Sequence, residues 1–276
     1  MFSRCLSVLL LALPALCADT HVLRVCADPN NLPFSNEARE GFENHLAAMI
    51  ARDMGAKLEY TWWSQRKSSI KNSLDAGRCD VLLGVPANLH SVEATKPYYR
   101  STYVFVSRRN RGLRVSSLND PELEKLRIGI QMVGDGYAPP AQVLARHNLS
   151  ANIAGYSLFG KNGEANPPAR IIEAVARGDV DIAIVWGPFA GFFARRQSSA
   201  LEITPVSPAA YMGIPFAYAI SAAVRIGDTQ LRGRIDDVLG QECSAIHALL
   251  RKYGVPQMPE GGLPCESPRL DSVSSR

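Results

Sequence analysis

The stretch DVLLGV at residues 80–85 is a continuous apolar run, which is typical of a strand buried on both faces of a parallel β-sheet. Upstream of it, LRVCA at 23–27 and KLEYTWW at 57–63 also predict strands. Between these strands, apolar residues recur at helical spacing over 41–54 and 68–76. The order strand, helix, strand, helix, strand predicts a doubly wound α/β layer with right-handed crossovers.

The same alternation recurs further along the chain. Its predicted strands lie at 127–131, 153–157 and 181–186, and its predicted helices lie at 139–145 and 169–177. Ligands of such layers sit beyond the carboxyl ends of the strands. We therefore expect the residues that face a ligand to stand at these strand ends.

Two strand-like segments connect the layers. STYVFVS at 101–107 alternates like a strand, and 203–206 followed by 216–224 supplies strands that return to the first layer, before an amphipathic helix at 231–253. We predict an α/β fold of two lobes, each a doubly wound sheet, joined by a two-strand hinge. The predicted domains are a signal peptide at 1–18, lobe 1 at 19–103 and 207–276, and lobe 2 at 104–206.

The N-terminal sequence MFSRCLSVLLLALPALCA has the layout of a secretory signal. One cation, Arg4, precedes an apolar run at 6–13 that is too short to span a membrane, and small residues follow Pro14. We expect cleavage after Ala18, with cleavage after Cys17 as the alternative. No later segment reaches the roughly 20 apolar residues of a spanning helix, so the sequence predicts an exported protein without a membrane span.

The composition is that of an ordinary globular protein. The 276 residues include 30 Lys and Arg against 26 Asp and Glu, which gives a net charge of +4, and 46% of them are hydrophobic. The surplus of positive charge is spread along the chain, with short pairs at Arg108/Arg109 and Arg195/Arg196. This pattern argues against a nucleic-acid partner. A chain of this length can bury a core without a metal, and we expect no cofactor.

Four cysteines remain after removal of the signal peptide: Cys26, Cys79, Cys243 and Cys265. An even number in an exported protein indicates disulfides, and the absence of any CxxC motif argues against a zinc site. Three pairings are possible. We favour Cys26 with Cys79 and Cys243 with Cys265, because each pair falls within one compact part of the chain. Four buried thiols are the alternative.

The whole mature chain resembles the periplasmic solute-binding proteins of the amino-acid-receptor type, family 3. The resemblance is carried by a first strand that ends in Asp28-Pro29 with Pro33-Phe34 soon after, by GRCDVLLG at 77–84, and by Pro-Tyr-Tyr at 97–99. It implies the type II periplasmic binding-protein fold and a location in the periplasm. Likeness at this level is good evidence for a fold and poor evidence for a ligand.

Longer stretches resemble one branch of that superfamily, the MoxJ/XoxJ-like proteins encoded beside quinoprotein alcohol dehydrogenases. They are LRVCADPNNLPFSN at 23–36, YTWWSQR at 60–66, GRCDVLLGVPA at 77–87, PYYRSTYVFVSR at 97–108 and NPPARIIEAVARGDVDIAIVWGP at 166–188. The resemblance implies a non-catalytic periplasmic partner of a dehydrogenase that uses pyrroloquinoline quinone (PQQ), or of its cytochrome, in methanol oxidation. It carries over no catalytic residues. Lobe motion about 101–107 and 204–207 would couple the cleft to the outer surface.

Two other functions remain open from the sequence. The chain could be the substrate-binding subunit of an ABC transporter for a small solute other than an amino acid. It could also be an enzyme on this fold, for which acid–base catalysis would need a positioned carboxylate or histidine. Asp28, Glu93 and Asp135 are the nearby acids, and none of them is paired in the sequence.

The resemblance also places the two groups with which amino-acid receptors hold a zwitterion. An Arg shortly before the Pro-Tyr-Tyr segment binds the carboxylate, and the family's spacing puts Asn88 at that place. An Asp that closes the last strand of the second lobe binds the ammonium, and here that place is Trp186. Without both anchors a zwitterion would carry two unpaired charges into a closed cleft, at a cost of several kcal/mol.

Aromatic residues stand at the predicted strand ends instead. We expect them to form a flat apolar wall with a few polar tips, suited to an uncharged, planar or protein-supplied group; the alternative is that part of the set packs in the core. The predicted cleft residues are Asp28, Asn30, Phe34, Trp62, Trp63, Val85, Asn88, Tyr98, Tyr99, Gln131, Asp135 and Trp186.

Overall fold

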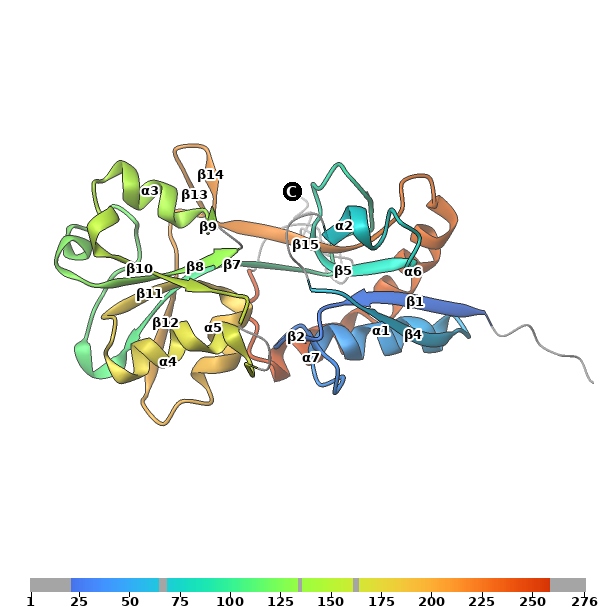
Figure 1. The fold of residues 1–276 in the computed structure, drawn as a ribbon, viewed down its shortest axis with the longest axis horizontal. Coiled ribbons are helices and arrows are strands. Elements are labelled where there is room, and N and C mark those ends of the chain that lie inside the picture. Colours follow the sequence, from blue (N-terminus) through green and yellow to red (C-terminus); the bar gives the residue numbers. More distant parts are fainter. Residues whose placement is uncertain (1–20, 65–68, 134–135, 161–163, 259–276) are drawn as a thin grey trace, which may run out of the picture.

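The computed structural model describes residues 21–64, 69–133, 136–160 and 164–258. Figure 1 shows two α/β halves that are joined in the middle by two long strands, β7 (Tyr99–Arg108) and β15 (Ala217–Val224). The strands of the main sheet follow the order β10-β8-β11-β7-β15-β5-β1-β4. The predicted α/β fold of two sheets with a two-strand connection is confirmed.

The first half contains strands β1 (Val22–Ala27), β4 (Lys57–Trp62) and β5 (Val81–Pro86), with helices α1 (Phe42–Asp53), α2 (Ser69–Asn72), α6 (Thr229–Gln241) and α7 (Cys243–Lys252). The second half contains strands β8 (Ile128–Val133), β10 (Ile153–Ser157), β11 (Ile182–Trp186) and β12 (Leu201–Pro205), with helices α3 (Pro140–Arg146), α4 (Arg170–Arg177) and α5 (Gly187–Ala194). Short strands are β2 (Asn30–Asn31), β3 (Ser35–Asn36), β6 (Glu93–Ala94), β9 (Gly136–Tyr137), β13 (Ala210–Tyr211) and β14 (Ile214–Pro215).

Both halves are built on parallel strands, and the crossing strands are antiparallel. In the first half β1 pairs in parallel with β4 and β5, and in the second half β8 pairs in parallel with β10 and β11. Strand β7 pairs with β15 at its start and with β11 and β12 at its end. The change of partner falls at Tyr103, whose N–H donates to Phe216 O at 2.8 Å while its carbonyl accepts from Val206 N at 3.0 Å.

This pairing corrects the first of the two segments predicted to return to the first layer and confirms the second. Residues 203–205 belong to β12 and pair with β7 inside the second half. The return to the first half is made by β15, after the β13–β14 hairpin. The sequence could not separate these segments, because both are short apolar runs and either could serve as a crossing strand. The lobe boundaries at 103/104 and 206/207 stay a prediction.

The helices differ from the prediction at three places. The helix predicted over 231–253 is divided at Glu242 into α6 and α7, and α2 is only four residues long. Helix α5 was not predicted, because its sequence GPFAGFFA carries two glycines and a proline. One of these glycines is required by packing: a Cβ on Gly191 would overlap the backbone carbonyl of Gly254 in the segment after α7. Helix α5 is therefore stabilised by burial of nearly all its residues.

The cysteine prediction is confirmed for one pair. Cys26 at the end of β1 forms a disulfide with Cys79, just before β5, and the two residues are 53 positions apart. Both lie in a buried apolar cluster. Cys243 is disulfide-bonded as well, whereas its predicted partner Cys265 lies outside the described residues, as does the predicted signal peptide.

Each half carries an aspartate with the same contacts just before one of its parallel strands. Asp80, which precedes β5, accepts hydrogen bonds from the backbone N–H and the guanidinium of Arg24 in β1. Asp181, which precedes β11, accepts hydrogen bonds from the backbone N–H of Arg127 at 2.9 Å and from its guanidinium at 3.3 Å. Burial raises the pKa of Asp181, but these bonds outweigh it and hold the pKa below its ordinary value. The two halves therefore resemble each other in their parallel strands and also in this contact between an aspartate and an arginine.

We expect Asp181→Ala to lower the free energy of unfolding by about 2 kcal/mol, because the backbone N–H and the guanidinium of Arg127 both lose their acceptor. Asp179→Ala is the matched control, since Asp179 forms an exposed ion pair with Arg177 and should contribute less than about 1 kcal/mol. Urea unfolding of both variants measures the difference. Equal losses in the two variants would mean that the backbone bond contributes nothing measurable.

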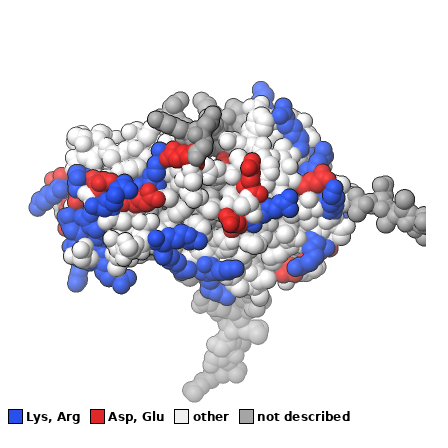
Figure 2. Space-filling view, turned by 60° about the horizontal axis from the view of Figure 1, so that its bottom comes forward, with Lys and Arg blue, Asp and Glu red and all other residues white. Residues whose placement is uncertain are grey.

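The helices, the charged surface and the metal-binding side chains bear on features that the sequence argued against. None of the helices in the described residues is long and apolar enough to cross a membrane. On the face shown in Figure 2, Lys and Arg side chains are interspersed with Asp and Glu and separated by uncharged surface. Within the described ranges, His, Cys, Asp and Glu side chains do not form a group of three or more that could hold a metal ion.

Candidate ligand-binding cavity

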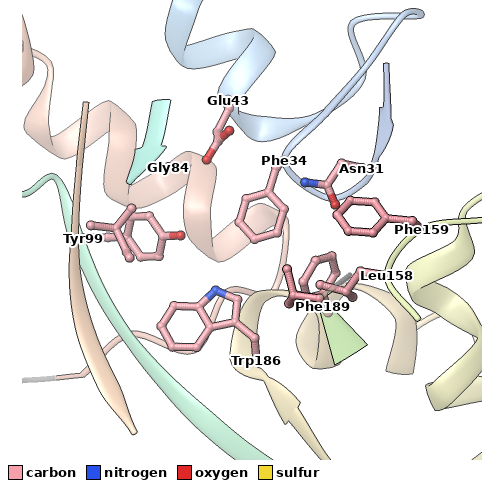
Figure 3. A pocket seen from close by; sticks show the side chains of 11 residues that line it. Asn31, Phe34, Glu43, Gly84, Tyr99, Leu158, Phe159, Trp186 and Phe189 are labelled. Carbon is pink, nitrogen blue, oxygen red and sulfur yellow. The ribbon is translucent and has the colours of Figure 1, made fainter. Parts of the chain in front are cut away.

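A cavity of about 200 Å³ lies between the two halves, near the carboxyl ends of their parallel strands. This is the position at which ligands bind in open α/β sheets. Figure 3 shows its side chains converging from both halves. The lining residues are Asn31, Phe34, Glu43, Gly84, Tyr99, Val133, Leu158, Phe159, Trp186, Phe189 and Ile220.

The carboxyl group of Glu43 is the polar centre of the cavity. Glu43 lies in the first turn of α1, where its N–H donates to Phe34 O at 2.9 Å, and its side chain extends from the helix into the cavity (Figure 3). The residue is only 5% exposed. Burial raises the pKa of its carboxyl group to about 8, and a hydrogen bond from the Tyr98 hydroxyl opposes the rise. Glu43 is therefore mainly protonated at neutral pH.

Two neighbours hold this carboxyl group. The Tyr98 hydroxyl donates to Glu43 Oε1 at 3.5 Å and accepts from the backbone N–H of Gly84 at 3.1 Å. Of the described lining residues none is Lys, Arg or His. The lining thus offers Glu43 hydrogen-bond donors but no positive charge.

Gly84 makes room for the carboxyl group from the opposite side. It has φ +76°, in the left-handed region, and a Cβ at this position would overlap Oε1 of Glu43. The glycine in the predicted strand DVLLGV is therefore needed for two reasons: the left-handed backbone conformation and the space that the Glu43 carboxyl group occupies.

We expect Gly84→Ala to destabilise the protein by about 2–3 kcal/mol, from left-handed strain together with overpacking against Glu43. Gly112→Ala is the matched control, because Gly112 has φ +60° and open space around it, so strain acts there alone. Chemical denaturation of both variants gives the difference. If the two losses are equal, the close approach of Glu43 has no energetic consequence.

Aromatic rings form the remaining walls beside Glu43. Phe34 contacts Phe189 across the two halves in an edge-to-face arrangement, with ring centroids 5.0 Å apart. Burial raises the pKa of the Tyr99 hydroxyl well above its ordinary value, and a hydrogen bond with the Trp186 side chain opposes the rise. The backbone N–H of Trp186 donates to Oε1 of the buried Gln131 side chain at 2.8 Å. This hydrogen bond holds the backbone at the end of β11, from which the indole extends.

Three of the predicted cleft residues, Phe34, Tyr99 and Trp186, line the cavity. Tyr98 and Gln131 lie directly behind the lining, as partners of Glu43 and of Trp186. The strand-end argument therefore located the cavity and part of its aromatic wall.

Asp28 and Asn30 serve the loop beside the cavity. Asp28 is buried, and its carboxylate accepts the backbone N–H of Asn30 at 2.9 Å, which is the contact of an Asx turn. The Asn30 amide joins the two halves: it donates to Glu164 O at 2.7 Å and accepts from Asn166 N at 3.2 Å. We expected both residues to face a ligand, and the structure gives them these structural contacts instead.

Four other predicted cleft residues lie outside the cavity lining. Trp62 stacks on Tyr60 at 4.7 Å on the edge strand β4, and Trp63 packs against the guanidinium of Arg78. Val85 is buried in the cluster around the Cys26–Cys79 disulfide, and Asn88 is exposed. Asp135 lies outside the described residues.

Sequence reasoning missed Glu43, Asn31 and the phenylalanines Phe159 and Phe189. An acidic residue in the first turn of a helix is ordinary, because it complements the helix dipole. The position of Glu43 therefore gave no reason to place it in a cavity. Phe189 lies in α5, which was not predicted at all.

Known proteins resemble the chain along nearly its whole described length. The family description "Bacterial extracellular solute-binding proteins, family 3" matches residues 23–255. Protein MoxJ of Methylorubrum extorquens is 31% identical over 252 residues, which are 87% of this chain and 83% of that protein. Protein MoxJ of Paracoccus denitrificans is 31% identical over 266 residues, which are 92% and 95% of the two chains.

A solved structure shows the same fold. The crystal structure of the periplasmic binding protein XoxJ from Methylobacterium extorquens AM1 superposes with a TM-score of 0.72 at 32% identity, covering 87% of this chain and 100% of that one. The similarity therefore extends over both halves of the fold.

Proposed function

The chain belongs to family 3 of the bacterial extracellular solute-binding proteins, and on this premise we propose that it is a non-catalytic periplasmic accessory protein of a quinoprotein alcohol dehydrogenase. The resemblance to the MoxJ/XoxJ-like branch is confirmed by relatives named MoxJ and XoxJ that match most of the chain. In this proposal the partner is a PQQ-dependent methanol or alcohol dehydrogenase, or its cytochrome. The protein supports the maturation or the activity of that enzyme.

One observation supports a departure from amino-acid transport. The lining has no anchor for the carboxylate of a zwitterion: Asn88, which stands where the resemblance places the receptors' Arg, is exposed at the surface, and none of the described lining residues is Lys, Arg or His. A zwitterion would leave its carboxylate without a guanidinium among the described lining residues. A role other than amino-acid delivery agrees with this lining.

Crosslinking of the tagged protein in periplasmic extract tests the proposal. We expect recovery of a quinoprotein dehydrogenase or a c-type cytochrome, and a lower PQQ content of that dehydrogenase in a strain that lacks the protein. The control is an amino-acid receptor of the same family that carries the same tag. It shows whether any protein of this fold would capture the dehydrogenase or the cytochrome non-specifically. Recovery of neither partner would contradict the proposal.

The alternative is the substrate-binding subunit of an ABC transporter for a small solute that is not an amino acid. It is favoured by the position of the cavity between the two halves, which is where a clamp holds a solute. This role predicts uptake of the solute that depends on the protein, and a thermal shift that grows with solute concentration. Both proposals require export, and N-terminal sequencing of the mature chain tests the predicted cleavage after Cys17 or Ala18.

A further inference from the structure

We propose that the cavity binds a small organic ammonium ion, held by the carboxylate of Glu43 within a cage formed by Phe34, Tyr99 and Trp186. We call these four residues the Glu43 cage. This inference rests on the proposed function in one respect, which is that the cavity is taken to bind a ligand. It names a class of ligand that differs from the uncharged or planar group expected from the sequence.

The arrangement of the cage carries the argument. In Figure 3 the Glu43 carboxyl group, the Phe34 ring, the Tyr99 hydroxyl and the Trp186 indole surround one space from different sides. Aromatic faces attract cations through the quadrupole of the ring, and cages of aromatic rings recognise substituted ammonium ions in this way. A carboxylate in the same cage supplies the countercharge.

The charge of the lining selects among ligands. Glu43 is the one carboxyl group among the described lining residues, which include no Lys, Arg or His. An anion would meet no positive group there, and a zwitterion would leave its own carboxylate unpaired. A neutral ligand would leave Glu43 protonated and would gain no ion pair with it. A single positive charge is the complement of this lining.

The size of the cavity limits the ligand further. Pockets for drug-sized ligands have volumes of about 300–1,000 Å³, and this cavity has about 200 Å³. Leu158, Phe159 and Phe189 close its other side with apolar surface. The cavity therefore fits a compact alkylammonium group rather than a long diamine, whose second charge would lie against these side chains.

Binding of a cation should displace a proton. The ionisable groups that face the Glu43 carboxyl group are the hydroxyls of Tyr98, just before β7, and of Tyr99, its first residue, and both remain neutral because burial raises their pKa. Glu43 itself is mainly protonated at pH 7 in the empty cavity, with a pKa of about 8. A bound ammonium ion favours the carboxylate, so Glu43 should lose its proton as the ion binds. Affinity should therefore rise between pH 6 and pH 9.

Calorimetry with choline and its uncharged isostere 3,3-dimethylbutan-1-ol tests the proposal. We expect choline to bind at least about tenfold more tightly than the alcohol. We also expect a heat of binding at pH 7 that varies with the ionisation enthalpy of the buffer, since a proton is released. Equal affinity for the two compounds, or saturable binding of neither, would overturn the proposal.

Two variants separate the cage from the fold. Glu43→Gln keeps the shape of the side chain, and it should weaken choline binding at least about tenfold and abolish the proton release. Trp186→Leu should weaken choline binding several-fold, whereas Trp63→Leu, the matched control outside the lining, should leave it unchanged. Unchanged binding by Glu43→Gln would overturn the proposal. If that variant does not fold, the pH dependence of the unaltered protein decides, because affinity that is constant from pH 6 to pH 9 contradicts a role for Glu43.

No dehydrogenase takes part in these titrations. Failure of choline to bind would therefore leave the crosslinking result untouched, and failure to recover a dehydrogenase would leave the calorimetric result untouched.

Discussion

Replacing both Cys26 and Cys79 by alanine is expected to lower the free energy of unfolding by about 4 kcal/mol. The disulfide closes a loop across 53 positions, and restricting a loop of this length in the unfolded chain contributes about 4 kcal/mol in the chain-entropy model. Alanine is preferred to serine because both sulfur atoms lie in a buried apolar cluster, where a hydroxyl group would add a cost of its own. Urea unfolding of the oxidised protein and of the double variant measures the effect.

The double variant is a cleaner test than reduction of the whole protein. Cys243 is also disulfide-bonded, so a reductant would remove more than the Cys26–Cys79 link. Adding the reductant to the double variant then measures how much the disulfide of Cys243 contributes to the free energy of unfolding. A loss below about 1 kcal/mol in the double variant would indicate that the unfolded chain is already compact between β1 and β5.

The fold could be predicted because each parallel strand is a short, fully buried apolar run between turn residues. LRVCA, DVLLGV and DIAIVW all became strands within one residue or two of their predicted limits. Of the two segments predicted to return to the first layer, 216–224 does so as β15 and 203–206 does not, because pairing between distant segments decides which of them crosses between the halves. Such pairing leaves no local pattern in the sequence.

The site could be predicted only as far as strand ends are informative. Tyr99 begins β7, Trp186 ends β11 and Phe34 lies in the loop after β1, and all three reach the cavity. Trp62 and Trp63 stand at the end of β4, which is the edge strand of the first half, and they lie away from it. A residue at a strand end is known to lie where the strands of the sheet terminate. Whether it lies near the centre of the sheet or at its outermost strand depends on the order of the strands, which the sequence does not give.

Glu43 illustrates a different limit of the sequence. Its helix was predicted almost to the residue, yet the carboxyl group enters the cavity only because Gly84, from a separate strand, leaves the space open. The meeting of these two residues depends on how α1 packs over β5. Neither the glycine nor the acid is unusual in its own segment.

The same residue leads to a large expected effect of pH on stability. The carboxyl group of Glu43 has an ordinary pKa of 4.5 when exposed, and burial raises it to about 8 in the folded protein. Between these values the folded protein retains a proton that the unfolded chain has lost, so the free energy of unfolding falls as the pH rises. From pH 5 to pH 8 we expect this residue to lower it by about 3–4 kcal/mol, with most of the loss complete once the pH passes 8.

Glu43→Gln isolates this effect, because glutamine has the same shape and no titrating proton. The free energy of unfolding of the unaltered protein, minus that of the variant, should decrease steadily between pH 5 and pH 8. Glu40→Gln, which removes an exposed acid just before the same helix, is the matched control for the loss of one carboxyl group at this place. If the difference between unaltered protein and Glu43→Gln is constant from pH 5 to pH 8, Glu43 is ionised in the folded protein throughout. A positive group must then reach its carboxylate, since burial without such a partner would keep the proton on.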